Sequence, residues 1–315
     1  MGFFTSSKSF TPKTDIPDLS GKVILVTGGN NGIGYQTTLL LSSHKPKQIF
    51  LCARSEEKFR AAQKEIEKTV PDPPITYLEL DLTSFESIRA AARNFLTQSD
   101  RLDLLYLNAG VMGLEPSITK DGYEVQFGTN HMGHALLTKL FMPILLKTAA
   151  EPNSDVRVIA VSSTLHASSV DGGIDFEGLK TPMESASAYK KYGQSKLANI
   201  LFANGLHRHF GDKGITAVSL HPGLVSTNIL GSYSGHNRLV GMANRFVAPL
   251  VAKSPENGAK NQLWAAFAKK GAQGVQSGEY YEPIGVAGKK NASARDEKLT
   301  QKLWEWTEKE LEGKE

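Results

Sequence analysis

Two residues four positions apart in the sequence could exchange a proton with a bound molecule. Tyr192 and Lys196 fall near the start of a helix predicted over residues 188–209, so their side chains project from one face, one turn apart. A phenol has an ordinary pKa of about 10, and a nearby ammonium is expected to lower that pKa by stabilising the phenolate, which suits a general acid or base. Alone, the pair also fits an exposed tyrosine and lysine on a helix surface. Motifs elsewhere in the chain favour the chemical interpretation.

A glycine-rich turn lies between the first predicted strand and the first predicted helix. Residues 22–26 are apolar and β-branched, as in a buried parallel strand, and an apolar helical pattern covers residues 35–41. Glycines in such a turn let the backbone approach a pyrophosphate, whose charge is favoured at a helix N-terminus. A plain turn would also use glycines, but the flanking strand and helix favour a dinucleotide site. The sequence therefore predicts a cofactor cradle made by Gly28, Asn30, Asn31, Gly32, Ile33 and Gly34.

The end of the second predicted strand (residues 48–53) indicates which dinucleotide binds. An acidic side chain about 20 residues beyond the last glycine binds the ribose 2′-hydroxyl of NAD, whereas an arginine there can hold the 2′-phosphate of NADP. This chain has Arg54 at that place and no carboxylate before Glu56. We therefore expect NADP(H), the alternative being a solvated arginine that opens the helix predicted over residues 56–70.

Two further strands end in residues that suit the rim of a cofactor site. The third (residues 75–80) leads into Asp81 and Leu82, and Asp81 is expected to accept a hydrogen bond from the adenine amino group or to cap the helix predicted over residues 84–96. The fourth (residues 102–107) ends in small residues that let the backbone pass beneath a cofactor ribose, or that form a tight turn: Asn108, Ala109 and Gly110.

Further candidate polar residues lie later in the chain. A helix predicted over residues 123–148 carries Asn130 among apolar neighbours, so its amide needs a polar partner such as a water. Ser163 follows the fifth predicted strand (residues 156–161), at the end of the strand where ligands gather in parallel sheets. The next strand (residues 215–220) leads into a sharp turn at His221, Pro222 and Gly223.

The alternation of strands and helices predicts an α/β fold. After an unpatterned loop (residues 164–187), the segment 224–254 is rich in Gly, Asn and Ser with scattered apolar residues, which suits a mobile lid over an apolar ligand. A helix (256–268), a seventh strand (278–281) and a charged C-terminal helix (296–311, within 290–315) follow. We expect a single Rossmann-type domain over residues 1–315, a doubly wound parallel sheet of about seven strands with helices on both faces. It begins with an N-terminal lead-in (residues 1–20), in which residues 13–20 are expected to be frayed.

Composition excludes several classes of protein. The 315 residues carry a net charge of +4 (36 basic minus 32 acidic) with no basic stripe, so we expect no nucleic-acid partner. The one cysteine, Cys52, allows neither an internal disulfide nor a zinc cluster, and we expect no metal and a cytoplasmic location. No apolar run approaches a membrane span, so no stable membrane insertion is expected. The N-terminus fits the loose template for acylation of Gly2, although Phe3 speaks against it.

Taken in order, these motifs resemble the short-chain dehydrogenase/reductase family over about residues 15–285. The residues that carry the resemblance are Thr27, Gly28, Gly32, Gly34, Asp81, Asn108, Ala109, Gly110, Asn130, Ser163, Tyr192, Lys196, Pro222 and Gly223. The long gap of 29 positions (192 minus 163) between Ser163 and Tyr192 is similar to the branch of retinol dehydrogenases and WW-domain oxidoreductases, as are the segments 195–201 and 221–223.

The resemblance implies roles for the candidate residues. Tyr192 would protonate the nascent alkoxide, Lys196 would bind the nicotinamide ribose and lower the tyrosine pKa, and Ser163 rather than Ser162 would hold the carbonyl oxygen. Asn130 would order a water that relays protons to Lys196. The nicotinamide end would be flanked by Pro222, Gly223, Val225 and Thr227. The resemblance also implies a homodimer or homotetramer paired through the helices that carry Asn130 and Tyr192.

We therefore expect an NADP(H)-dependent oxidoreductase that acts on a carbonyl or secondary alcohol of an apolar small molecule, as a ketone or aldehyde reductase. A non-catalytic NADP(H) sensor or scaffold is the first alternative, and it is disfavoured because the chain keeps all four proton-transfer residues. The second alternative is a different reductive step in a biosynthetic pathway, such as imine reduction, which the sequence does not separate from ketone reduction.

Overall fold

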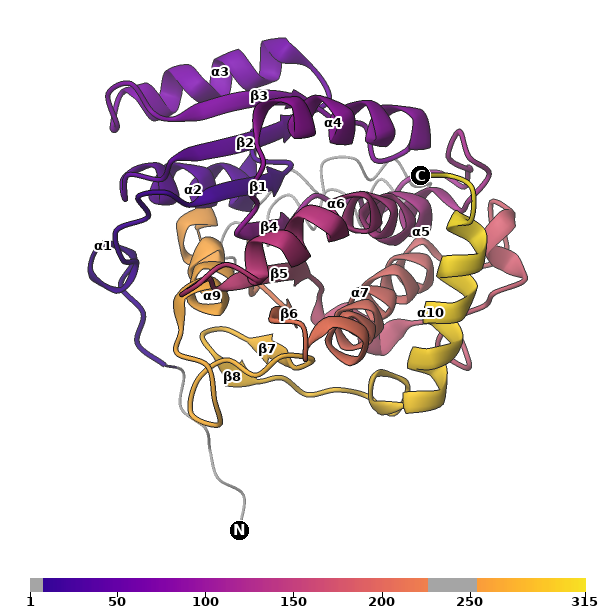
Figure 1. The fold of residues 1–315 in the computed structure, drawn as a ribbon. Helices are drawn as coiled ribbons and strands as arrows, with labels where there is room; N and C mark the ends of the chain where they lie inside the picture. The colour runs from indigo at the N-terminus through magenta and orange to yellow at the C-terminus, as the bar shows by residue number, and fades with distance from the viewer. Residues whose placement is uncertain (1–7, 226–253) are drawn as a thin grey trace.

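An eight-stranded sheet runs through the computed structural model, which describes residues 8–225 and 254–315 (Figure 1). The strand order is β3-β2-β1-β4-β5-β6-β7-β8, and all neighbours are parallel except β7 and β8. The strands are β1 (Val23–Thr27), β2 (Gln48–Ala53), β3 (Ile75–Glu79), β4 (Leu104–Leu107), β5 (Val156–Val161), β6 (Ile215–Leu220), β7 (Tyr280–Glu282) and β8 (Val286–Ala287). The doubly wound α/β class is confirmed. The expected seven strands become eight because the two-residue β8 is too short to leave a periodic signal.

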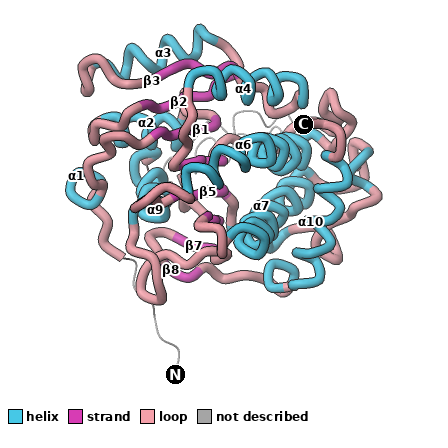
Figure 2. The backbone as a smooth tube through the Cα atoms, in the orientation of Figure 1, coloured by secondary structure: helices cyan, strands magenta, loops and turns pink. Residues whose placement is uncertain are grey.

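Helices cover both faces of the sheet, as Figure 2 shows. One face carries α4 (Phe85–Gln98), α6 (Gly133–Ala149) and α7 (Ala188–Phe210), and the other carries α2 (Gly32–Ser42), α3 (Glu56–Glu67) and α9 (Pro255–Phe267). The strands alternate accordingly: Val23 and Leu25 pack on the α7 face, whereas Ile24 and Val26 pack on the α9 face. A strand buried on both faces is apolar throughout, which is why β1 was visible in the sequence.

The helix expected over residues 123–148 is interrupted at Asn130. A short α5 (Val125–Phe127) passes into a π-helical segment η1 (Gly128–Met132), which then continues as α6. A π-turn shifts the backbone hydrogen bonds by one residue and often marks a functional site. Here the carbonyl of Asn130 lies 3.0 Å from Nδ1 of His134.

The segment before β1 is ordered, so the expectation of a frayed lead-in is wrong for its described part. A short helix α1 (Pro12–Asp15) is flanked by apolar side chains that are buried against the α9 face: Phe10, Ile16 and Leu19. Because those side chains are scattered without a period, their burial could not be predicted from the sequence.

The C-terminal helix α10 (Glu297–Leu311) packs along the outer side of α7 (Figure 1). The Trp304 ring stacks on Phe202 and His209 of α7, and Thr307 contacts His131 at 3.0 Å. Lys139 of α6 pairs with Glu308 at 2.8 Å. α10 thus covers part of the surface of α6 and α7 that the expected pairing of subunits would use.

Shorter elements lie in the loops. The stretch 164–187 contains two 3₁₀ turns, η2 (Thr164–Ser168) and η3 (Gly178–Lys180), and a third, η5 (Ser293–Arg295), precedes α10. Most of the lid expected over residues 224–254 lies outside the described residues, as do Gly2 and Phe3.

Candidate active site

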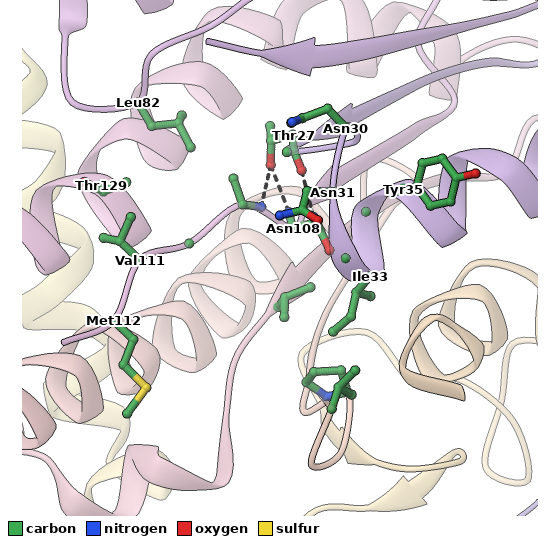
Figure 3. Close-up of a pocket in the computed structure, with 18 of the residues that line it drawn as sticks. Thr27, Asn30, Asn31, Ile33, Tyr35, Leu82, Asn108, Val111, Met112 and Thr129 are labelled. Atoms are coloured by element: carbon green, nitrogen blue, oxygen red, sulfur yellow. Dashed lines mark hydrogen bonds between the residues drawn. The ribbon is translucent and has the colours of Figure 1, made fainter. Parts of the chain in front are cut away.

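A cavity of about 1030 Å³ opens at the carboxyl ends of β1, β2, β4, β5 and β6. Figure 3 shows Ile33 of α2 on one side of this cavity and Leu82, Val111 and Met112 on the other. The glycine turn, Arg54, Ser163 and Tyr192 all contribute to its wall. Ligands of open α/β sheets bind in this position, so the fold and the cavity point to the same site.

The turn after β1 requires glycine at two positions. Gly28 has a φ of +65°, which L side chains rarely adopt. A Cβ on Gly34 would lie 2.3 Å from the Gly28 carbonyl oxygen and 2.5 Å from Nδ2 of Asn108. No side chain fits there, so the backbone of this turn stays open to a ligand.

Hydrogen bonds tie the glycine turn to the end of β4. The Asn108 side chain donates to the Thr27 carbonyl at 2.9 Å, and the backbone amides of Asn108 and Ala109 each donate to the Thr27 hydroxyl at 2.9 Å (Figure 3). One threonine therefore holds two walls of the cavity together, a role that the sequence analysis did not give to Thr27.

The start of α2 fits a phosphate group. Its N-cap residue Asn31 makes no side-chain capping hydrogen bond, so the first backbone N–H groups of the helix keep their capacity to bind an anion. Asn31 and Gly32 both line the cavity. The residues present therefore fit a dinucleotide pyrophosphate.

At the far end of the cavity two cations come together. Arg54 and Lys58 both line it and both are solvent-exposed. Among the described residues the structure gives neither of them a salt bridge, whereas Arg60, two residues beyond Lys58, pairs with Glu56 at 2.9 Å. This end of the cavity can accept a further negative charge.

Asp81 does not cap the next helix, so that expectation is wrong. The side chain of Ser84 accepts the capping hydrogen bond of α4 from the Ser87 amide. Asp81 instead accepts hydrogen bonds from the amide and the hydroxyl of Thr83 at 3.0 and 2.8 Å. Its contact with adenine stays a prediction, and Asp81 does line the cavity.

At the other end of the cavity, Ser163, Tyr192 and Lys196 meet. The Tyr192 hydroxyl and the Ser163 side chain hydrogen-bond to each other, and the Lys196 ammonium lies 5.6 Å from the centre of the Tyr192 ring. Lys196 donates to the Val161 carbonyl at 2.9 Å. The neighbouring Ser162 is engaged elsewhere, because its hydroxyl donates to the Lys196 carbonyl at 2.7 Å.

The expected lowering of the Tyr192 pKa is not found. Burial raises the pKa of Tyr192 to about 12, and the hydrogen bond with Ser163 opposes this only in part. Burial also lowers the pKa of Lys196 to about 7. Both shifts follow from removing water around the charged forms. Tyr192 is therefore a protonated phenol at neutral pH, which is the form that donates a proton.

Asn130 lies behind this group and does not line the cavity. Its Nδ2 donates to the Ser195 hydroxyl at 2.9 Å and to the Val111 carbonyl at 3.0 Å, and its Oδ1 accepts from the Val111 amide at 2.8 Å. A Cβ on Gly110 would lie 3.2 Å from both Oδ1 of Asn130 and Nζ of Lys196. Protein groups thus provide the polar partners that the sequence led us to expect, and Gly110 gives the two side chains room.

Nearly all predicted cofactor residues line this one cavity. They are Gly28, Asn30, Asn31, Gly32, Ile33, Gly34, Arg54, Asp81, Leu82, Asn108, Ala109, Gly110, Tyr192, Lys196, Pro222, Gly223 and Val225. Thr227 lies outside the described residues. Whether each of them contacts a cofactor stays a prediction.

Several cavity residues were not predicted. Met112, Leu165, Tyr189 and His221 line the reaction end. Tyr189 stands three positions before Tyr192, so helical spacing could have placed it on the same face. His221 was noted only as part of a turn. Met112 and Leu165 follow strand ends in loops without periodicity, and the sequence carries no signal for them.

Comparison with known proteins decides the family. The family model described as short chain dehydrogenase matches residues 22–177. An uncharacterized oxidoreductase of Schizosaccharomyces pombe is 38% identical over 306 residues, which cover 96% of this chain and 89% of that protein. The chain belongs to the short-chain dehydrogenase/reductase family. Its retinol dehydrogenase-like branch is supported by human retinol dehydrogenase 13, which is 37% identical over 93% of this chain and 84% of its own length.

A solved structure agrees with the fold of this short-chain dehydrogenase/reductase. An uncharacterized protein from Mycobacterium paratuberculosis superposes with a TM-score of 0.73 and 26% identity, over 97% of this chain and 98% of its own. Within residues 8–225 and 254–315, no helix combines the length and the apolar character that crossing a membrane requires.

Proposed function

We propose that this short-chain dehydrogenase/reductase is an NADP(H)-dependent ketone or aldehyde reductase that acts on apolar small molecules. The observation that carries the proposal is that one cavity is shared by the glycine turn, by Arg54 with Lys58, and by the Ser163–Tyr192–Lys196 group. Binding and proton-transfer groups that share one cavity can act on a substrate and a cofactor together.

The cofactor is held by the chain at three places. The first turn of α2 and the backbone around Gly28 receive the pyrophosphate. Arg54, with Lys58 beside it, binds the 2′-phosphate, and the small residues Ala109 and Gly110 leave space for the nicotinamide ribose. When bound, NADP(H) supplies or accepts the hydride.

Tyr192 is the proton donor for reduction. Its phenol is protonated at neutral pH because burial raises the pKa to about 12, and its hydroxyl is within hydrogen-bonding reach of Ser163. As negative charge develops on the substrate oxygen, Tyr192 delivers its proton to that oxygen. The resulting phenolate is favoured by a positive charge on Lys196, whose ammonium lies 5.6 Å from the ring centre.

Ser163 and Asn130 support this transfer in different ways. Ser163 donates to the substrate oxygen and so stabilises the charge that forms there. Asn130 fixes the loop at Val111. Its Oδ1 and the Lys196 ammonium both lie beside Gly110, and a water bound between them would return a proton to the lysine.

The residues that line the mouth of the cavity favour an apolar substrate. Among the described lining residues, the reaction end carries Val111, Met112, Leu165 and Leu224, and no carboxylate. Leu224 is 66% exposed and therefore available to a ligand. Such a wall gains free energy by covering apolar surface and gives no counter-ion to a cationic substrate.

The test is NADPH oxidation with a panel of apolar ketones and aldehydes, monitored by absorbance, alongside cofactor binding measured by fluorescence. We expect turnover with several members of the panel and slower turnover with NADH. Tight NADPH binding without turnover of any carbonyl would overturn the catalytic part of the proposal, and equal use of both cofactors would overturn the NADP preference.

A further inference from the structure

A group of buried polar atoms lies behind the reaction end of the cavity without partners. Between η2 and the ends of β6 and β7, four side-chain atoms have no hydrogen bond within the part of the chain that the structure describes: Nε2 of His166, Oγ of Ser219, Nδ1 of His221 and the hydroxyl of Tyr280. Each such atom costs about 1–3 kcal/mol if it stays unpaired. Four together indicate a polar region that water or a ligand group enters.

The strand register explains why these side chains share one face. Ile215 and Ala217 of β6 pack on the α7 face, and Ser219 and His221 continue the same alternation. Ser219 is paired with Tyr280 of β7, whose ring meets the ring of His166 with centres 5.1 Å apart. The group therefore spans the ends of β6 and β7 and the η2 turn.

His221 is the member of this group that reaches the cavity. It lines the cavity wall, while the other three do not. Its Nδ1 is buried and has no partner among the described residues, so we assign the cavity side of the ring to Nε2. The Ser162 amide bonds to the Leu220 carbonyl at 2.6 Å, so His221 stands on the strand next to Ser163.

The surroundings of His221 keep its imidazole neutral. Burial lowers the pKa of His221 to about 4, and the nearby carboxylate of Glu282 opposes that shift while His166 adds to it. In a neutral imidazole one nitrogen accepts and the other donates. In the tautomer that carries the proton on Nε2, Nδ1 is left to accept from a water behind it and Nε2 donates into the cavity.

We propose that His221 is a specificity-determining residue whose Nε2–H donates to a second oxygen of the substrate, one or two carbons from the reacting carbonyl. Neighbouring strands stand about 4.8 Å apart, which suits two oxygens of one small molecule, one held at Ser163 and the other at His221. The favoured substrates are therefore dicarbonyls or hydroxyketones with an apolar remainder. This inference rests on the proposed carbonyl reduction.

Two polar variants test it, H221N and H221Q. The glutamine side chain keeps a donor near the position of Nε2, whereas the asparagine side chain reaches only the position of Nδ1. The assay compares kcat/KM for 2-hexanone, 2,3-hexanedione and 2,4-hexanedione with NADPH. The ratio of dione to ketone is compared between each variant and the native protein, so the intrinsic reactivities of the substrates cancel.

We expect H221N to lower this ratio about three- to tenfold for at least one dione, as loss of one hydrogen bond predicts, and H221Q to keep it within about twofold. The apolar control L165A, on the same wall, should shift kcat/KM for all three substrates alike. If H221N does not fold by its thermal transition, H221S loses the same Nε2 atom and carries the comparison.

Three results would overturn the inference. An unchanged ratio in H221N is the first. The second is an equal loss for ketone and dione together with a raised KM for NADPH, which would assign His221 to the cofactor. The third is no turnover of any carbonyl despite NADPH binding, which would remove the proposed function as well. The first two leave carbonyl reduction standing.

Discussion

Replacing Arg54 by alanine should weaken NADPH binding far more than NADH binding. Arg54 lines the cavity next to Lys58 and, among the described residues, has no carboxylate partner. The two cofactors differ only in the 2′-phosphate, so a loss confined to NADPH measures the contact with that group.

The magnitude follows from the exposure of the side chain. A hydrogen bond to a charged group is worth about 1.5–3 kcal/mol when well shielded. Arg54 is exposed, and solvent screening reduces this to about 1–2 kcal/mol. The Kd for NADPH should therefore rise about five- to thirtyfold, while the Kd for NADH should change less than about twofold. Because Lys58 remains, some preference for NADPH should persist.

The assay is titration of each cofactor by fluorescence at two salt concentrations. The difference in affinity between NADPH and NADH should become smaller at high salt, because the contact of Arg54 with the 2′-phosphate is exposed to solvent. Arg60→Ala is the matched control: Arg60 is a nearby exposed arginine that pairs with Glu56 and does not line the cavity. Equal losses for NADPH and NADH in Arg54→Ala, or a similar NADPH loss in the control, would refute the assignment of Arg54 to the phosphate.

Three further predictions concern the glycine turn and the stability of the fold around the site. Gly34→Ala should abolish NADPH binding in titrations, because its Cβ would lie 2.3 Å from the Gly28 carbonyl oxygen; unchanged affinity would show that the turn can open. His131 should make the protein acid-sensitive, because burial lowers the pKa of this imidazole to about 3 in the folded protein. In the unfolded chain the same group takes up its proton as pH falls below about 6.5. The free energy of unfolding should therefore decrease as pH falls from about 6.5 to about 3. At pH 5 this amounts to about 2 kcal/mol, and urea unfolding at pH 7 and 5 should show a smaller pH effect in His131→Gln than in the native protein. Trp304→Ala should lower the free energy of unfolding by about 3 kcal/mol, since the ring stacks on α7 above Gly205; a loss below about 1 kcal/mol would mean that α10 is loosely attached.

The sequence predicted the parts of the fold that depend on local pattern. β1 was visible because both of its faces are buried, and the helix predicted over residues 188–209 matches α7 to within one residue. The glycine turn was visible because glycine at residues 28 and 34 is required by a positive φ and by a backbone contact.

What the sequence could not predict depends on contacts between distant residues. The π-helical turn at Asn130 is accompanied by contacts with Val111, Ser195 and His134, and no local propensity encodes them. His221 appeared to be part of a simple turn, because its neighbours come from η2 and β7. The predicted direction of the Tyr192 pKa shift was wrong for the same reason. The spacing shows the nearby lysine but not how deeply the phenol is buried.

The central claim is that Tyr192 gives a proton to the substrate oxygen, and Tyr192→Phe tests it most directly. The variant keeps the ring and loses the hydroxyl, so NADPH affinity should stay within about threefold while kcat for ketone reduction falls about 10²- to 10⁴-fold. Tyr77→Phe, on β3 and away from the cavity wall, is the control for removing a phenol hydroxyl. If Tyr192→Phe reduces ketones at more than about a tenth of the native rate, the proton comes from another group and the account is wrong.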